Sequence, residues 1–235
     1  MKPTQNFKSE QNVIAGVIRK YGLADAIAMI HGNVYIAGGA VLSSFTGMKV
    51  NDVDLYCDNP STIRSMRAAL IKCGYKLECE TINSYTFTKD KKVVQLITRF
   101  HGDPETVLSY FDFTVTQALY DIRTGLFYFG DRFFGDLAKR EIVFTSTSIY
   151  PICSLYRTIK YREKGFEVKG YTLMLLALAI ARLEMKTYKE LKEQLMGVDT
   201  MLLQGIFKDE TNFREDLPID YGKFVEAVFR EKDLV

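Results

Sequence analysis

The sequence predicts an α+β protein, in which a mixed β-sheet with flanking helices is followed by an all-helical C-terminal part. Short apolar runs that end at glycines or polar turns recur over residues 34–129, and they predict the strands of the sheet. Helical patterns lie between these runs, whereas from about residue 150 only helical spacing remains. We therefore expect an N-terminal helix over 1–30, a sheet-containing part over 31–146 and a helical part over 147–235.

The individual elements follow from two patterns of apolar residues, the helical spacing and the period-2 alternation of strands. Apolar residues keep roughly helical spacing over 9–31, with Gly22 as an interruption, which predicts a packing helix. Strands are then expected at 34–37, 52–56, 75–79, 84–88, 93–98, 111–120 and 125–129. Further helices are expected at 63–73, 103–110, 131–139, 152–164, 170–183, 187–196, 199–207 and 221–231.

A glycine turn interrupts the first strand pattern and opens a helix. The apolar run Val34–Ala37 ends at Gly38 and Gly39, and a helical stretch follows. Glycines let the backbone approach a ligand closely, and a helix N-terminus presents N–H groups to it, so this turn suits a phosphate. Ser43 or Ser44 could add a hydroxyl to the bound nucleotide, although helix capping or solvent contact is the alternative interpretation.

Two carboxylates follow in the next strand. Asp52 and Asp54 stand at i and i+2, so both point to one face of the strand. Such carboxylates repel each other unless a cation lies between them, and hard oxygen ligands suit Mg²⁺. Either motif alone is commonly a turn or a solvated strand end. Their ordered combination predicts a phosphate site beside a metal site, as nucleotidyl transfer requires.

The composition excludes several other classes of protein. The net charge is +2 over 235 residues, so no global basic field indicates a nucleic-acid binder. The four cysteines form no C-x-x-C pair and there are two histidines, so zinc is not expected. No apolar run reaches membrane-spanning length and the polar N-terminus lacks a signal-peptide core, so we expect a cytoplasmic protein that does not cross a membrane.

From about Val34 to Val168 the chain resembles the head and neck of class II tRNA nucleotidyltransferases, the CCA-adding enzymes and bacterial poly(A) polymerases. Four segments in the family's order carry the resemblance: Ala37–Val41, Asp52–Asp54, Asp112–Asp121 (DFT…ALYD) and Phe134–Phe166 (FGDL…RTIKY…GF). The resemblance implies a nucleotidyltransferase head, two Mg²⁺ ions and an NTP substrate such as ATP. Asp52 and Asp54 would then be catalytic, metal-binding residues, with Gly38 and Gly39 at the nucleotide.

The chain departs from the family's pattern where the family selects the base. Leu42 and Ser43 replace an Arg-Asp pair, and Tyr110 and Phe111 replace two arginines. The family's Glu-Asp-x-x-Arg motif corresponds to Tyr150–Ser154, whose side chains cannot make the same paired donor–acceptor contact with a base edge. We therefore do not expect ordered CCA addition, although the metal and phosphate motifs are retained.

Nucleotidyltransferases of this fold often place a third carboxylate on a neighbouring strand, where it activates the acceptor hydroxyl. By position the strand at 93–98 should carry it, but this strand offers Gln95, an amide that cannot act as a base. Glu78, Glu80 or Asp112 could substitute. Asp112 is the first choice for a catalytic role, because an unpaired carboxylate between aromatic residues would be costly. A structural hydrogen bond is an equally good interpretation of Asp112.

The acceptor is predicted less directly. Arg157, Lys160 and Lys164 fall on one helical face by i, i+3 and i+7 spacing, where they could contact RNA phosphates or form a solvated face. The predicted function is transfer of a nucleoside monophosphate from an NTP to an RNA 3′ end, as in tRNA processing, with pyrophosphate release. The alternatives are the same chemistry on a protein, small-molecule or nucleotide acceptor, or a nucleotide-binding module without catalysis.

Overall fold

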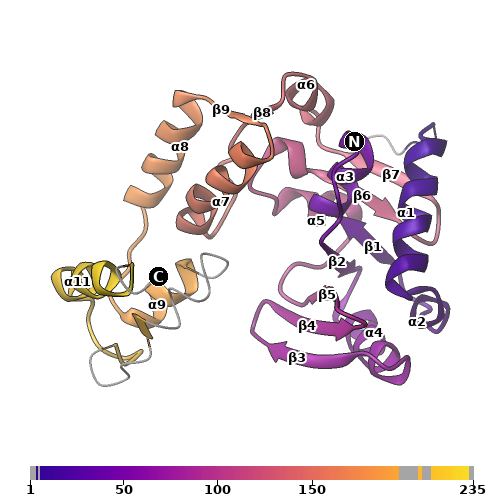
Figure 1. The fold of residues 1–235 in the computed structure, drawn as a ribbon, viewed down its shortest axis with the longest axis horizontal. Coiled ribbons are helices and arrows are strands. Elements are labelled where there is room, and N and C mark those ends of the chain that lie inside the picture. The colour runs from indigo at the N-terminus through magenta and orange to yellow at the C-terminus, as the bar shows by residue number, and fades with distance from the viewer. Residues whose placement is uncertain (1–3, 5, 196–205, 208–212, 233–235) are drawn as a thin grey trace. The chain divides into compact units, whose positions relative to one another are not determined.

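The computed structural model describes residue 4 and residues 6–195, 206–207 and 213–232. The chain divides into two compact units, Met1–Lys139 (unit 1) and Arg140–Val235 (unit 2), whose elements are labelled in Figure 1. Most of the helix expected at 199–207 lies outside the described residues. None of the described helices is both long enough and apolar enough to span a membrane.

Unit 1 is built on a mixed sheet of seven strands among the described residues, in the order β3-β4-β5-β2-β1-β6-β7. These strands are β1 (Val34–Ala37), β2 (Asp52–Cys57), β3 (Lys76–Glu80), β4 (Ser84–Lys89), β5 (Lys92–Ile97), β6 (Ala118–Asp121) and β7 (Leu126–Phe129). Strands β2 and β5 are parallel, whereas the other neighbours are antiparallel. The predicted α+β fold class is confirmed.

Glycines or short polar residues mark some of the helix ends in unit 1. They are α1 (Lys8–Tyr21), α2 (Ala24–Ala28), α3 (Gly39–Thr46), α4 (Pro60–Lys72), α5 (Pro104–Ser109) and α6 (Phe133–Ala138). Gly22 adopts the left-handed conformation and ends α1, so the helix expected over 9–31 is two helices. The side chains of Asn59 and Asp103 cap α4 and α5, each followed by proline.

The two faces of the sheet are covered differently. On one face Val53, Leu55 and Val94 are fully buried, and α3 and α4 contact the strands that carry them. On the other face Tyr35 and Tyr56 belong to a cluster with Val107 and Leu108 of α5. Asp52 and Asp54 share this second face with Tyr56, yet Asp52 is exposed and Asp54 is half-buried. The acidic end of β2 is therefore accessible.

The strand expected at 111–120 is wrong in its first part. Thr114–Thr116 form a 3₁₀ helix (η1), and the strand β6 begins only at Ala118. Thr114 Oγ1 donates to the carboxylate of Asp136, and Thr116 Oγ1 donates to the carbonyl of Phe113. The bond of Thr116 is local and competes with strand formation, whereas the bond of Thr114 reaches a residue on α6; the spacing of the aromatic side chains reveals neither.

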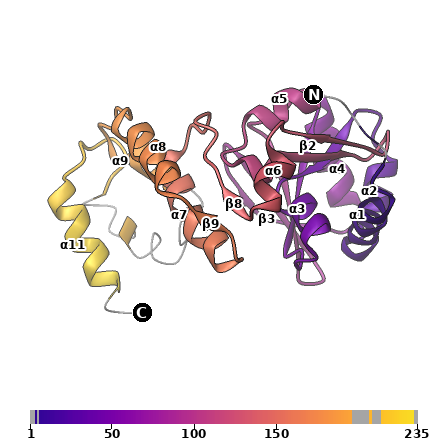
Figure 2. The same cartoon turned by 90° about the horizontal axis from the view of Figure 1, so that it is seen from above.

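Unit 2 is mostly helical, with α7 (Pro151–Glu163), α8 (Gly170–Ala181), α9 (Tyr188–Gln194) and α11 (Tyr221–Lys232). Helices α7 and α8 lie side by side in both views (Figures 1 and 2). A parallel pair of short strands, β8 (Glu141–Ile142) and β9 (Glu167–Val168), corrects the expectation that only helices follow residue 150. Each strand has two residues, too few to show an alternating pattern.

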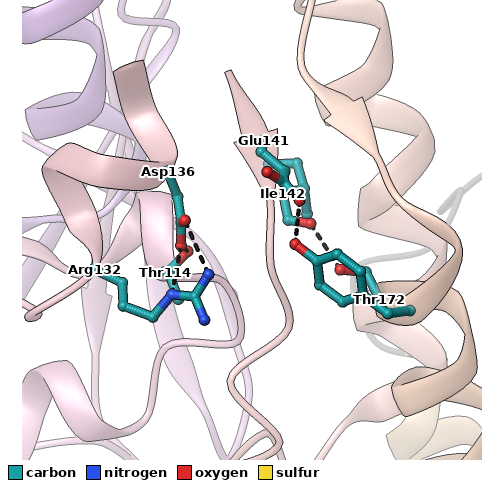
Figure 3. Close-up of polar contacts among 7 residues, drawn as sticks. Thr114, Arg132, Asp136, Glu141, Ile142 and Thr172 are labelled. Atoms are coloured by element: carbon teal, nitrogen blue, oxygen red, sulfur yellow. Dashed lines mark hydrogen bonds and ion pairs between the residues drawn. The ribbon is translucent and has the colours of Figure 1, made fainter. Parts of the chain in front are cut away.

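Two side-chain hydrogen bonds connect the start of α8 to β8. Thr172 Oγ1 donates to the carbonyl of Ile142 over 2.8 Å, and the hydroxyl of Tyr171 donates to the carboxylate of Glu141 (Figure 3). Thr172 is fully buried, so its hydroxyl needs this internal acceptor. The short ladder is thus held by side chains as well as by backbone pairing.

Candidate active site

The glycine turn after β1 has the geometry of a ligand loop. Gly38 has φ +66° and ψ −126°, a conformation that favours glycine. A Cβ atom on Gly38 would lie 2.7 Å from Cε1 of Phe111, so a larger residue is also excluded sterically. A Cβ on Gly39 would meet no described atom within 4 Å. Gly39 begins α3, whose first N–H groups lack intrahelical acceptors by geometry. The turn is therefore open where a phosphate would bind.

The strand pairing places the carboxylates beside this turn. In the antiparallel pair of β1 and β2, Ile36 stands opposite Leu55. One residue further, Ala37 comes next to Asp54, and the glycine turn starts there. Adjacent strands lie about 4.8 Å apart. The structure thus brings together the two predicted halves, the glycine turn and the pair Asp52 and Asp54.

The neighbour on the other side of β2 is the parallel strand β5. Its register pairs Asp54 with Gln95 and Asp52 with Val93. On β4 the next residue in the row is Thr86, paired with Gln95. Asp54, Gln95 and Thr86 therefore lie across three adjacent strands on one face. Gln95 lies next to Asp54 on the strand where the resemblance places a third carboxylate.

The three carboxylates considered as substitutes, Glu78, Glu80 and Asp112, do not form a cluster with Asp52 and Asp54. Among the described residues, no group of three or more His, Cys, Asp or Glu side chains could hold a metal. Asp112 is 4% exposed. Glu78 accepts from Thr88 Oγ1 at 2.7 Å and pairs with Lys76 at 3.0 Å, and these contacts lower the pKa of Glu78. Glu80 pairs with Arg67 at 3.1 Å. The catalytic role of Asp112 stays a prediction.

The donor set at β2 fits one Mg²⁺ ion. Mg²⁺ at nucleotide sites is commonly held by one or two carboxylates and by substrate phosphates, with water completing the octahedron. Asp52 and Asp54 would supply the carboxylates, and the open turn at Gly39 leaves room for the phosphates. With an amide at Gln95, the second of the two expected ions has no third carboxylate and stays a prediction.

The two serines of α3 make contacts inside their own helix. Ser43 Oγ donates to the carbonyl of Gly39 over 2.8 Å, and Ser44 Oγ donates to the carbonyl of Val41 over 2.7 Å. These bonds agree with the alternative interpretation, in which the hydroxyls satisfy the helix backbone. A contact of either serine with a nucleotide stays a prediction.

The predicted RNA-binding residues lie on α7 in unit 2. The guanidinium of Arg157 and the ammonium of Lys164 lie 5.8 Å and 5.3 Å from the ring centroid of Tyr161, which is buried. Arg157 also donates to the hydroxyl of Tyr161 over 3.4 Å. Lys160 is exposed. Two of the three cations thus stabilise a core tyrosine, and phosphate contact stays a prediction.

Tyr21, which no sequence pattern indicated, supports the start of β2. Its buried hydroxyl donates to the carbonyl of Val50 over 3.2 Å, and Tyr75 donates to the carbonyl of Tyr21. Burial and then the negative charge of Asp52 raise the pKa of Tyr21. The phenol therefore lies close to Asp52 and holds the segment that leads into it. No local pattern links residue 21 with residue 50.

A second unforeseen network stabilises the segment after Asp112. The carboxylate of Asp136 on α6 accepts from Thr114 Oγ1 at 2.6 Å and from two nitrogens of Arg132 at 3.1 Å each (Figure 3). Asp136 is 3% exposed and all these partners lie in unit 1. This bidentate, hydrogen-bonded arrangement is typical of a structural carboxylate.

Solved structures that are similar to this chain include CCA-adding enzymes. A Thermotoga maritima CCA-adding enzyme in complex with tRNA gives a TM-score of 0.61 at 18% identity, covering 99% of this chain and 55% of that chain. A CCA-adding enzyme with CTP gives 0.63 at 16% identity, covering 100% and 56%. At these identities the likeness shows the nucleotidyltransferase fold alone. The chain spans about half the length of these structures.

Sequence comparison points to a different family with the same fold. A curated relative, Gabija anti-defense 2 of Bacillus phage SPbetaL7, is 30% identical over 221 residues, covering 86% of this chain and 53% of the relative. The family model for Gabija anti-defense 2 proteins matches residues 6–140, which include the glycine turn, the acidic pair and Gln95. The chain therefore belongs to the Gabija anti-defense 2 family.

Proposed function

We propose that this protein is a metal-dependent nucleotidyltransferase, which transfers a nucleoside monophosphate from an NTP to an acceptor and thereby acts against Gabija defense. The observation that supports the proposal most strongly is the strand register that puts the open glycine turn beside Asp52 and Asp54. Membership of the Gabija anti-defense 2 family supports a role against Gabija defense, and the likeness to CCA-adding enzymes in fold supports nucleotidyl transfer as the reaction.

The reaction exchanges one phosphorus–oxygen bond for another. An acceptor oxygen attacks the α-phosphorus, the bond from that phosphorus to the oxygen bridging to the β-phosphate breaks, and pyrophosphate leaves with the electron pair. The backbone at Gly38 and Gly39 would bind and orient the phosphates, and Asp52 and Asp54 would hold Mg²⁺. Mg²⁺, when bound, neutralises charge on the phosphoryl oxygens. Positioning by the turn supplies the rest of the rate.

The resemblance predicts an RNA 3′ end as the acceptor. The basic face of α7 is a weak accompanying indication, and two of its cations, Arg157 and Lys164, lie against the ring of Tyr161. The proposed reaction is therefore defined by its donor, an NTP, and by release of pyrophosphate. A nucleotide-binding module without catalysis would bind NTP and release no pyrophosphate.

Transfer of label from α-³²P-NTPs tests the proposal. The pure protein is incubated with Mg²⁺, each NTP and an extract of cells that carry Gabija defense. We expect label in one acceptor fraction with the native chain and at least a hundredfold less with Asp52→Asn/Asp54→Asn. The matched control is Asp25→Asn/Asp131→Asn, which removes two exposed carboxylates elsewhere in unit 1 and should leave transfer intact.

The link to defense needs a second measurement. Phage that depend on this protein for growth on Gabija-carrying cells should lose that growth when Asp52 and Asp54 are replaced by asparagine. If the doubly substituted protein still protects the phage, nucleotidyl transfer is not the anti-defense activity. If neither protein labels any fraction of the extract, the nucleotidyltransferase proposal is wrong.

A further inference from the structure

The row of residues beside Asp54 has a chemical consequence for the acceptor. Asp54, Gln95 and Thr86 lie on neighbouring positions of β2, β5 and β4, share one face of the sheet and are each half-buried. Gln95 is half-buried and directly adjacent to Asp54. An amide side chain has a carbonyl acceptor and two N–H donors, but it cannot take up a proton at neutral pH.

The other carboxylates near this face are not placed to take up a proton. Glu78 is held by Thr88 and Lys76, two strands beyond β5, and Glu80 is paired with Arg67. Asp112 is 4% exposed and forms no three-carboxylate group with Asp52 and Asp54 among the described residues. Asp52 and Asp54 are the carboxylates assigned to Mg²⁺. Gln95 is thus the side chain that adjoins the pair at the position of the usual base.

We propose that the acceptor is an oxygen anion that is already ionised at neutral pH, such as a phosphate monoester or a carboxylate, and not a hydroxyl group. The inference rests on the proposed nucleotidyl transfer. A hydroxyl acceptor must lose a proton during attack, and a positioned general base typically contributes about 10²–10⁴-fold to such a step. An ionised oxygen has no proton to lose, so such an acceptor can react at this site without a general base.

Gln95 has a positive role in this assignment. Its N–H groups can donate to an anionic acceptor oxygen beside Asp54, whereas a carboxylate at the same position would repel that oxygen. The acceptor oxyanion bonds to the α-phosphorus and pyrophosphate leaves. The product is a phosphoanhydride when the acceptor is a phosphate, and an acyl phosphate anhydride when it is a carboxylate. No proton is transferred in either case.

The linkage formed in the labelled product tests the inference even while the acceptor itself is unidentified. The labelled fraction from the extract is treated separately with a phosphoanhydride-cleaving pyrophosphatase and with neutral hydroxylamine. Release of labelled nucleoside monophosphate by the pyrophosphatase supports a phosphate acceptor, and release by hydroxylamine supports a carboxylate acceptor. Label that resists both treatments is not joined through either anhydride, and this result overturns the inference while nucleotidyl transfer stands. Absence of label overturns both.

Substitution of Gln95 provides an independent test. Gln95→Glu should lower transfer to the native acceptor by roughly tenfold or more, because it replaces a donor with a repelling charge. Thr86→Glu is the matched control, since it adds the same charge one strand further from Asp54 and should retain transfer. Gln95→Met, which removes the donor without adding charge, should fall between them. Unchanged or increased transfer by folded Gln95→Glu would contradict an anionic acceptor.

Discussion

At the scale of single residues, the two glycines of the turn have different tasks. Gly38→Ala should destabilise unit 1 by about 2 kcal/mol or more, because φ is +66° and the new Cβ would contact Phe111. Gly39→Ala has open space and should change stability by less than about 1 kcal/mol. Urea unfolding of the two variants measures this difference. Equal losses of stability would contradict the geometry of the turn.

A larger residue at Gly39 tests nucleotide binding separately from folding. Gly39→Val keeps the fold but puts a branched side chain where the phosphates would approach, so Mg²⁺-dependent NTP binding should weaken at least tenfold. Isothermal titration with each NTP measures the affinity. Binding that is as tight as that of the native chain would mean that the nucleotide does not use this turn.

Asp136 should be important for stability and not for catalysis. Asp136→Asn leaves Arg132 without its bidentate partner and should cost about 1–3 kcal/mol in the free energy of unfolding. Glu226→Gln, which breaks an exposed pair with Arg230, should have little effect. Thermal or urea unfolding checks both. A native-like stability of Asp136→Asn would show that the network of Figure 3 contributes little.

At the scale of elements, a phenylalanine cluster holds the helix that begins at the glycine turn. The ring of Phe45, near the end of α3, lies 5.2–5.8 Å from the rings of five other phenylalanines. These are Phe7, Phe127, Phe129, Phe133 and Phe134. The cluster therefore joins the N-terminal segment, α3, β7 and α6 within unit 1.

Phe45→Ala should consequently destabilise unit 1 by about 3 kcal/mol, a cost typical of removing a large aromatic side chain from a packed cluster. Phe45→Leu keeps most of the volume and should cost clearly less. Chemical unfolding followed by far-ultraviolet circular dichroism gives both values. Similar stabilities of the alanine and leucine variants would show that the cluster is loosely packed.

Local periodicity was sufficient for most elements but not for their arrangement. The strands at 84–88 and 93–98 were predicted almost to their bounds, because asparagine and charged turns separate them. The prediction of a strand over residues 111–117 was wrong, because a tertiary contact of Thr114 overrides the alternating pattern of side chains in this segment. Strand order depends on packing between distant residues, so the full sheet order could not be derived from local pattern.

In the candidate site, too, the features that are local in sequence could be predicted and the contacts between distant residues could not. Its motif residues, Gly38, Gly39, Asp52 and Asp54, stand out because each motif is local in sequence. The substitution of Gln95 for a carboxylate was also recognisable by position. The engagement of Glu78 with Thr88 and the support of Tyr21 for Val50 depend on strand register and helix packing, which no short pattern encodes.

At the scale of the whole molecule, the division into two units predicts autonomous folding. Residues 1–139 contain the complete seven-stranded sheet and its own buried cluster, so this fragment should fold and unfold cooperatively. A urea titration of the fragment, compared with the full chain, tests this. A fragment without a cooperative transition would show that unit 1 depends on residues 140–235.

Alkaline pH should destabilise unit 1. Burial raises the pKa of the Cys57 thiol, the Tyr35 phenol and the Tyr75 phenol, each to about 12. Since these pKa values are raised on folding, their stabilising effect is complete below about pH 9 and is lost as the pH rises towards 12. The free energy of unfolding should therefore fall over this range. Tyr35→Phe should reduce the slope, and an unchanged slope would contradict the burial of that phenol.

Pyrophosphate release by the pure protein, in the presence of Mg²⁺, NTPs and the cell extract, tests the central claim most directly. Nucleotidyl transfer at the site formed by Gly39, Asp52 and Asp54 predicts pyrophosphate in step with α-label incorporation, and loss of both in Asp54→Asn. Equal release of pyrophosphate and equal incorporation of label by Asp54→Asn would contradict it.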